Sequence, residues 1–319
     1  MAVIGKDINK AKQLLREGQL VAIPTETVYG LAANALEPRA VTKIFSAKNR
    51  PAFDPLIIHV PSIERVLHYA KNFPAVAKRL AAAFWPGPLT LVLEKRDIIP
   101  DLVTAGLPTV GIRCPDHALT RQLLDELEFP LAAPSANPFG YISPTTPEHV
   151  QGQLGTQIPY ILDGGACEVG IESTIVGFDN GQAIVLRHGG LKTEDIEKVI
   201  GKIFLAVNAS SNPRAPGQLN SHYAPRKKLL AGDLSILTKK YVHQNPGVLA
   251  FQTDYNFPVQ QILSSSGDLE EAARNLFAAM RKLDESSCNF IISEYVPDTG
   301  LGKAINDRLK RAAHSTLTH

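Results

Sequence analysis

The sequence has few cysteines and no long apolar run. Its three cysteines, Cys114, Cys167 and Cys288, are far apart and form no CxxC pair, which argues against a zinc module or a disulfide framework. Isolated thiols of this kind are typical of a reducing cytosol. No stretch of about 18 apolar residues occurs, and the N-terminus lacks the apolar core of a signal peptide. We therefore expect a soluble, cytoplasmic protein without membrane contact.

The chain also lacks an excess of charge of either sign. Its 319 residues include 33 Lys+Arg and 31 Asp+Glu, which gives a formal net charge of +2. This balance provides no global field that would recruit nucleic acid or an anionic membrane, so any anion site must be local. There is no Walker A motif and no GxGxxG, so a phosphate site would be of another kind.

Short apolar runs alternate with helical patterns along most of the chain. The runs include "LVAIP", "PLIIHV", "LTLVLE" and "STIVGF", and helical spacing lies between them at Pro38–Lys48 and Ala75–Phe84. This alternation predicts an α/β domain with a mixed sheet over residues 1–205. Residues 206–227, rich in Asn, Ser, Pro and Gly, predict a linker, and residues 228–319 predict a smaller α/β unit.

The segment "AKNRPAFDPLIIHV" brings several charged side chains together. Lys48 and Arg50 lie at the end of a predicted helix, where cations commonly do no more than complement the helix dipole. Pro51 and Pro55 stiffen the connection to an apolar strand that carries His59, although a histidine there is more often a core residue than a ligand. A rigid loop with a guanidinium and an ammonium group suits polyphosphate.

Further polar side chains flank other predicted strands. In "PTVGIRCP", Thr109 and Arg113 share one strand face because strand residues alternate. In "PLAAPSANPFGYISP", Ser135, Asn137 and Ser143 follow an apolar strand, although short polar residues usually make turns. No nucleophile with a partner base and no metal cage is evident. The pattern favours an enzyme that positions two substrates so that one attacks the other.

Taken in order, several motifs closely resemble the two-domain form of threonylcarbamoyl-AMP synthase. They are "PTETVYGL", "KNR", "NRPAFDPL", "PSAN", "STIV" and "APGQLNSHYAP", and they span about residues 7–225. Beyond them the resemblance is one of length and coarse pattern. It implies a YrdC-like twisted mixed-sheet domain at residues 1–205, a linker over the active site at 206–227, and a smaller Rossmann-like α/β domain at 228–319.

The resemblance also implies a reaction. Family members use ATP, bicarbonate and L-threonine and release threonylcarbamoyl-AMP and pyrophosphate. Threonine and bicarbonate give an N-carboxy intermediate, whose carboxylate attacks the α-phosphate. The product passes to the transferase machinery that installs threonylcarbamoyladenosine beside the anticodon of tRNA. The implied activity is a nucleotidyltransferase in which Mg²⁺ accompanies ATP, without a metal cage built by the protein.

Site residues follow from the matching motifs. Lys48 and Arg50 are the expected catalytic cations. The residues expected to bind ATP are Arg50, Asp54, Thr109, Ser135, Asn137, Ser143, Arg187 and Tyr223. The residues expected to surround L-threonine are Thr27, His59, Arg113, Ala133 and Ser173.

One position departs from the family pattern, and one alternative function stays open. Asp54 stands where the family usually has Asn, and a carboxylate only accepts hydrogen bonds and repels phosphate. It can hold Arg50 or Lys48, accept from a ribose hydroxyl, or help to hold Mg²⁺, and the sequence does not choose. A YrdC-like domain can also be a non-catalytic module that contacts double-stranded RNA or tRNA, although the balanced charge argues against this.

Overall fold

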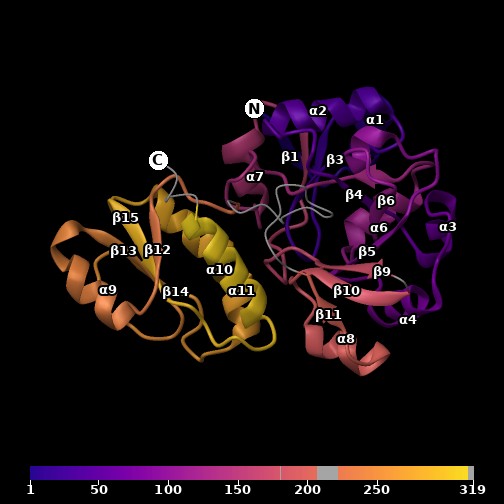
Figure 1. Cartoon of the computed structure of the whole chain (residues 1–319). Coiled ribbons are helices and arrows are strands. Elements are labelled where there is room, and N and C mark those ends of the chain that lie inside the picture. The colour runs from indigo at the N-terminus through magenta and orange to yellow at the C-terminus, as the bar shows by residue number, and fades with distance from the viewer. Residues whose placement is uncertain (180, 207–221, 315–319) are drawn as a thin grey trace.

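The chain folds around two β-sheets, a large one in its first two thirds and a small one in its last third (Figure 1). The structure, a computed structural model, describes residues 1–179, 181–206 and 222–314. Most of the predicted linker at 206–227 therefore lies outside the described residues. Within the described ranges, no helix is long and apolar enough to cross a membrane.

The large sheet contains both parallel and antiparallel pairs of strands. Its strands are β1 (Val3–Gly5), β2 (Val21–Ile23), β3 (Gly30–Asn34), β4 (Ile57–His59), β5 (Leu89–Glu94), β6 (Thr109–Arg113), β7 (Leu131–Ala132), β8 (Tyr160–Leu162), β9 (Thr174–Asp179), β10 (Gln182–Arg187) and β11 (Phe204–Leu205). They lie in the order β1, β8, β2, β3, β7, β4, β6, β5, β9, β10, β11. Strand β6 pairs in parallel with β4 and antiparallel with β5, so the prediction of a mixed sheet is confirmed.

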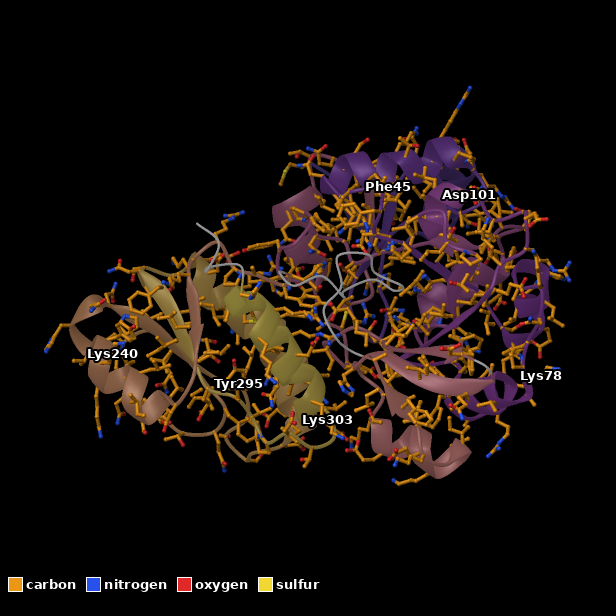
Figure 2. All side chains as sticks on the ribbon, viewed as in Figure 1. Phe45, Lys78, Asp101, Lys240, Tyr295 and Lys303 are labelled. Atoms are coloured by element: carbon orange, nitrogen blue, oxygen red, sulfur yellow. The ribbon has the colours of Figure 1, made fainter. Side chains whose placement is uncertain are left out.

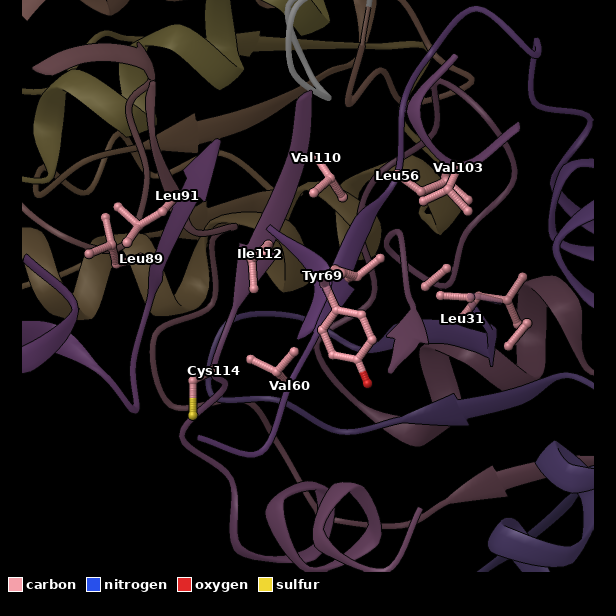
Figure 3. Packing of buried hydrophobic residues seen from close by; sticks show 14 of the residues in the cluster. Leu31, Leu56, Val60, Tyr69, Leu89, Leu91, Val103, Val110, Ile112 and Cys114 are labelled. Carbon is pink, nitrogen blue, oxygen red and sulfur yellow. The ribbon is translucent and has the colours of Figure 1, made fainter. Parts of the chain in front are cut away.

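Helices cover both faces of the large sheet. They are α1 (Ile8–Arg16), α2 (Pro38–Lys48), α3 (Val66–Tyr69), α4 (Ala75–Phe84), α5 (Asp101–Thr104), α6 (Ala118–Asp125), α7 (Pro147–Leu154) and α8 (Thr193–Ile200), with a 3₁₀ turn at Ile63–Arg65. Helices α2, α4 and α5 pack on one face in a cluster that includes Leu91, Val110 and Ile112 (Figure 3). Helices α1 and α6 pack on the other face.

The small sheet is parallel throughout. Its strands, β12 (Leu229–Ala231), β13 (Pro246–Ala250), β14 (Gln260–Ile262) and β15 (Phe290–Ser293), lie in the order β12, β15, β13, β14. In β13, Val248 and Ala250 pack towards α9 (Leu234–Tyr241), which a 3₁₀ turn at Val242–Gln244 follows. The intervening Leu249 packs towards α10 (Leu269–Glu285) and α11 (Gly302–His314), because strand side chains alternate between faces. A parallel sheet between two helical layers agrees with the predicted α/β class.

Helices α10 and α11 lie between the small sheet and the large domain (Figure 1). One hydrophobic cluster crosses this junction and joins Ile142 and Ile171 to Phe277 of α10. The backbone at Gly170, with φ of +77°, approaches α10 so closely that a Cβ atom would lie 2.4 Å from the Cα of Arg274. Only glycine tolerates this conformation and this contact. At the same junction, Lys303 of α11 pairs with Glu194 of α8 at 2.6 Å (Figure 2).

Candidate active site

A small cavity lies on the face of the large sheet opposite the cluster of Figure 3. Its volume is about 50 Å³, and strands β4 and β6, the loops beside β7 and β9 and the end of β10 form its walls. The residues that line it are Val28, Arg50, Ile57, His59, Arg113, Ala133, Pro134, Ser135, Glu172, Ser173, Arg187, His222 and Tyr223. Eight of these were predicted from the sequence, namely Arg50, His59, Arg113, Ala133, Ser135, Ser173, Arg187 and Tyr223. The fold thus brings members of both predicted groups, the one for ATP and the one for threonine, to one cavity.

Strand alternation explains how two of these side chains meet. In β6, Val110 and Ile112 are buried in the cluster of Figure 3, so Arg113 projects from the opposite face. His59 is the register partner of Arg113 on the neighbouring strand β4. Thr109, at the other end of β6, does not line the cavity, and four strand steps separate it from Arg113 by about 13 Å. A ligand that contacts both residues must therefore be long.

A β-bulge directs Arg187 into the cavity. The pairing of β10 with β9 shifts between Val185 and Arg187, so that Arg187 opposes Ile175 where regular pairing would place Leu186. An extra residue in one strand re-aims the side chains that follow it. Arg187 Nη2 donates to the backbone oxygen of Ser173 at 2.8 Å and to its Oγ at 3.2 Å. The guanidinium and the hydroxyl therefore form one polar corner of the cavity.

The "KNR" motif is a helix end whose two cations point into buried surroundings. Asn49 ends α2 with a left-handed backbone, φ 50°, which asparagine tolerates better than most residues. Lys48 Nζ donates to the backbone oxygen of Ser135 at 2.5 Å and to that of Asn137. Burial, and secondarily Arg50, holds the pKa of Lys48 well below its ordinary value. Lys48 ties α2 to the 135–137 loop and does not itself line the cavity.

Arg50 lines the cavity and is paired behind it with Asp54. Arg50 Nη2 lies 2.8 Å from Asp54 Oδ2, and it also donates to the backbone oxygen of Pro55 at 2.9 Å. Asp54 is fully buried and does not reach the cavity. Burial raises its pKa, against the opposing effects of Arg50 and Lys48. The sequence left three roles open for Asp54: to hold a nearby cation, to accept from a ribose hydroxyl, or to help hold Mg²⁺. The structure shows the first of these, with Arg50 as the cation.

The side of the cavity that was assigned to threonine holds a second buried ion pair. Arg113 Nη2 lies 2.7 Å from Glu26 Oε2, which also accepts from the backbone N–H of Asp116 at 3.1 Å. Burial, followed by the charge of Arg113, lowers the pKa of the adjacent His59 to about 3, so this imidazole is neutral at pH 7. Ser173 Oγ lies 2.8 Å from Thr90 Oγ1. This wall therefore presents the ion-paired guanidinium of Arg113, the neutral imidazole of His59 and the hydroxyl of Ser173 to the cavity.

Three further predicted residues lie behind the cavity wall. Thr27 is fully buried, and its Oγ1 is 2.8 Å from that of Thr25. Asn137 donates from Nδ2 to the backbone oxygens of Pro138 and Tyr141, so it closes the turn after "PSAN". Ser143 donates to Glu172 Oε1 at 2.5 Å. In this arrangement their contacts are with the protein.

Sequence reasoning missed three charged or polar residues of this site, Glu26, Glu172 and His222. Glu26 was visible in "PTETVYG", but nothing local linked it to Arg113. Glu172 and His222 both line the cavity, and no motif marked Glu172. The His222 ring lies 4.2 Å from that of Tyr223, and burial, with Arg50 and Lys48 next, holds its pKa well below the ordinary value. His222 directly precedes Tyr223 in the "HYAP" motif, and this position was the one signal in the sequence that pointed to it.

Tyr223 closes the cavity from the side of the C-terminal domain. Its backbone is left-handed, φ 63°, which is uncommon for a bulky residue and typical of sites held by their surroundings. Its ring stacks on Phe277 of α10 with centroids 5.7 Å apart, and the guanidinium of Arg308 lies 5.1 Å from its centroid. Its hydroxyl has no hydrogen-bond partner among the described residues.

Comparisons with known proteins agree in identifying this architecture. A family model described as "Telomere recombination", named for Sua5, YciO and YrdC, matches residues 13–189. A second, described as "Threonylcarbamoyl-AMP synthase, C-terminal domain", matches residues 191–314. The chain is thus a YrdC-like enzyme of the nucleotidyltransferase kind with an added C-terminal domain.

Matches over nearly the whole chain make the assignment specific. The threonylcarbamoyl-AMP synthase of Pyrococcus abyssi is 41% identical, over 96% of this chain and 94% of that protein. That of Bacillus subtilis is 42% identical, over 96% and 92%. The crystal structure of P. abyssi Sua5 complexed with L-threonine superposes with a TM-score of 0.91 at 40% identity, covering 98% of this chain and 97% of that one. This chain belongs to the threonylcarbamoyl-AMP synthase family.

Proposed function

We propose that this protein makes L-threonylcarbamoyl-AMP and pyrophosphate from ATP, bicarbonate and L-threonine. The observation that supports this best is the cavity itself, which Arg113 and His59 of the threonine group line together with Arg50 and Arg187 of the ATP group. A relative of high structural similarity is known in complex with L-threonine. The described cavity contains no paired nucleophile and base, so the substrates react with one another.

The proposed steps use the residues for binding and charge stabilisation. Arg113 holds the threonine carboxylate, and its ion pair with Glu26 fixes the direction of the guanidinium. The threonine amine adds to bicarbonate with loss of water and gives the N-carboxy intermediate. A carboxylate oxygen of this intermediate then attacks the α-phosphorus, and the bond to pyrophosphate breaks. Arg50 and Arg187 offset the charge that develops on the phosphates.

The cavity of about 50 Å³ is smaller than most ligand sites, which occupy several hundred Å³. We propose that part of its wall moves when ATP and threonine bind. Tyr223 and His222 adjoin the predicted linker, whereas the other walls belong to the large sheet. We propose that this segment lies over bound nucleotide, as predicted for residues 206–227, with Lys48, Thr109, Asn137 and Ser143 completing the ATP site.

Mg²⁺ is part of the proposal as a companion of ATP. Among the described residues, no group of three or more His, Cys, Asp or Glu side chains is placed to hold a metal ion. Glu172, the one carboxylate that lines the described cavity, already bonds Ser143 and Arg308. These residues do not fit a protein-built cage, so phosphate oxygens and water would supply most of the ligands. Mg²⁺ would supply charge neutralisation of the phosphates.

We further propose that the product is consumed in the cytoplasm by the transferase machinery that modifies tRNA beside the anticodon. The alternative, a non-catalytic module for double-stranded RNA, is less well supported. Arg50, Arg113 and Arg187 are each less than 10% exposed and face a cavity that a duplex cannot enter. Salt-dependent binding of tRNA in the absence of ATP would favour the alternative.

Release of pyrophosphate by the purified protein tests the proposed function. We expect release from ATP with Mg²⁺ only when both L-threonine and bicarbonate are present. Serine in place of threonine, and a buffer freed of carbon dioxide, are the matched controls. Release that is independent of either co-substrate would contradict the reaction.

A further inference from the structure

An arginine of the C-terminal domain reaches the wall of the cavity. Arg308 lies on α11 and is fully buried. Its Nε and Nη2 donate to Glu172 Oε2 at 3.1 and 3.0 Å, and its Nη1 donates to the backbone oxygen of His188 at 2.6 Å. Glu172 belongs to the large domain and lines the cavity. A single guanidinium thus connects α11 to two segments of the catalytic domain.

The surroundings of Glu172 place it on the nucleotide side of the site. Its Oε1 accepts from Ser143, a residue of the predicted ATP group. The Arg308 guanidinium that holds its Oε2 also lies over the ring of Tyr223, another member of that group. Its neighbour in sequence, Ser173, belongs to the predicted threonine group but accepts from Arg187 of the ATP group, so Glu172 lies near the boundary between the two groups. This carboxylate lines the same cavity as Arg50 and Arg187, the two cations that the proposed function assigns to the phosphates of ATP.

We propose that Arg308 is a positioning residue for the nucleotide: it neutralises Glu172 in the cavity wall and supports the ring of Tyr223 from behind. This inference rests on the proposed use of ATP and gives the C-terminal domain a part in it. Arg308 touches no reacting group. It acts through the charge of Glu172 and the position of Tyr223, so without this guanidinium the carboxylate would face a polyanion without its ion-pair partner.

Charge determines the size of the expected effect. One unit charge without its ion-pair partner, about 6 to 12 Å from a phosphate and at an effective dielectric constant of about 20, weakens binding by roughly 10- to 100-fold. On the threonine side, Arg113 is paired with Glu26 and not with Glu172, so loss of Arg308 should not change how Arg113 binds threonine. Loss of Arg308 should therefore weaken ATP binding far more than threonine binding. A general loss of structure would affect both ligands alike.

Calorimetric titration of the full chain with ATP, and separately with L-threonine, tests the inference. Arg308→Met should weaken ATP binding at least 10-fold and threonine binding less than 3-fold. The double variant Arg308→Met with Glu172→Gln removes both charges of this pair, while Asp307, which also contacts Arg308 at 3.2 Å, keeps its ion pair with Arg311 at 3.0 Å. It should restore ATP affinity to within about 3-fold of the unmodified protein. Lys303→Met is the matched control, because Lys303 forms another ion pair across the same junction, with Glu194 at 2.6 Å. It should leave both affinities unchanged.

Several results would overturn the inference: unchanged ATP affinity in Arg308→Met, equal loss for both ligands, or no recovery in the double variant. If Arg308→Met does not fold, Glu172→Gln alone decides. It leaves the cation in place and removes the negative charge, so it should tighten ATP binding several-fold without affecting threonine, and unchanged or weaker ATP binding overturns the inference. If the unmodified protein binds ATP but releases no pyrophosphate, the proposed reaction fails while the role of Arg308 in nucleotide binding is still decided.

Discussion

Glu26 holds Arg113 by an ion pair of 2.7 Å inside the site, with both side chains no more than about 7% exposed. Glu26 is itself held by the backbone N–H of Asp116 at 3.1 Å. A guanidinium has five N–H groups, so pairing one edge with Glu26 leaves others directed at the cavity. The carboxylate therefore orients the cation that we expect to bind the carboxylate of threonine.

The first prediction follows from this pair. Glu26→Gln removes the charge that orients Arg113, so the KM for threonine should rise by about 10-fold or more, the scale of one charge-assisted hydrogen bond. The KM for ATP should change by less than about 3-fold. Pyrophosphate release measured against each substrate in turn checks both values.

Glu128→Gln is the control for this variant. Glu128 also pairs with an arginine, Arg16, but on the protein surface. Exposed pairs contribute little, so neither KM should change. An unchanged KM for threonine in Glu26→Gln would show that Glu26 does not orient Arg113 for threonine binding.

Local patterns made part of this site predictable. Because strand residues alternate, Arg113 was expected on the strand face that does not carry Val110 and Ile112. The pairing of β4 with β6 then places His59 beside Arg113 on the same face. The alternation of apolar runs with helical spacing was enough to predict a mixed α/β class. These features depend on neighbours within a few residues, which a single sequence displays.

Contacts between distant segments could not be predicted. Glu172 and Arg308 are 136 residues apart, and no periodicity relates them. Sequence alone did not order eleven strands, because each pairing depends on all the others. The bulge before Arg187 adds one residue to the register, and nothing in "VLRHGG" announces it. Likewise, the departure at Asp54 was visible, but its contact with Arg50 required the fold.

The second prediction concerns the hydroxyl of Tyr223, which lines the cavity without a partner among the described residues. Tyr223→Phe keeps the stack on Phe277 and removes only this hydroxyl. ATP binding should weaken by about 3- to 10-fold, the value of one hydrogen bond, while the melting temperature stays nearly constant. Tyr223→Ala should weaken it further because the stack is lost.

Tyr69→Phe is the matched control for Tyr223. Tyr69 is also buried, but it packs in the cluster of Figure 3, on the far face of the large sheet. Titration with ATP should give the same affinity for this variant as for the unmodified protein. If Tyr223→Phe also retains full affinity, the segment does not contact the nucleotide through this residue.

The third prediction is a pH dependence of stability from His59. Its pKa in the folded protein is lowered from 6.5 to about 3 by burial and by Arg113. Between these values the unfolded chain binds a proton that the folded protein does not, so stability is lost as the pH falls below about 6.5. From pH 7.5 to pH 5 this one group accounts for about 2 kcal/mol of the free energy of unfolding.

Urea unfolding at the two pH values measures this contribution. His59→Gln should lose about 2 kcal/mol less than the unmodified protein over the same interval, because its residue 59 does not titrate. The exposed His243, replaced by Gln, serves as the control and should lose as much as the unmodified protein. Equal losses in the two variants would show that His59 is not held neutral by the fold.

The last prediction tests the carboxylate of Asp54, whose Oδ2 lies 2.8 Å from Arg50 Nη2 behind the cavity wall. Asp54→Asn keeps an oxygen of the same size beside Arg50 but removes a negative charge that opposes phosphate. We expect ATP binding to tighten by about 3- to 10-fold, corresponding to roughly 1 kcal/mol of relieved repulsion. The melting temperature should fall, because a buried cation loses its charged partner.

Titration with ATP, thermal melting and turnover at saturating ATP together decide what Asp54 does. Asp101→Asn is the control, since Asp101 pairs with Lys95 at the surface and should change none of the three (Figure 2). Tighter binding with unchanged turnover would mean that the carboxylate only holds Arg50. Lost turnover in a folded variant that still binds ATP would mean that the charge takes part in the reaction, because an amide of the same shape could not replace it.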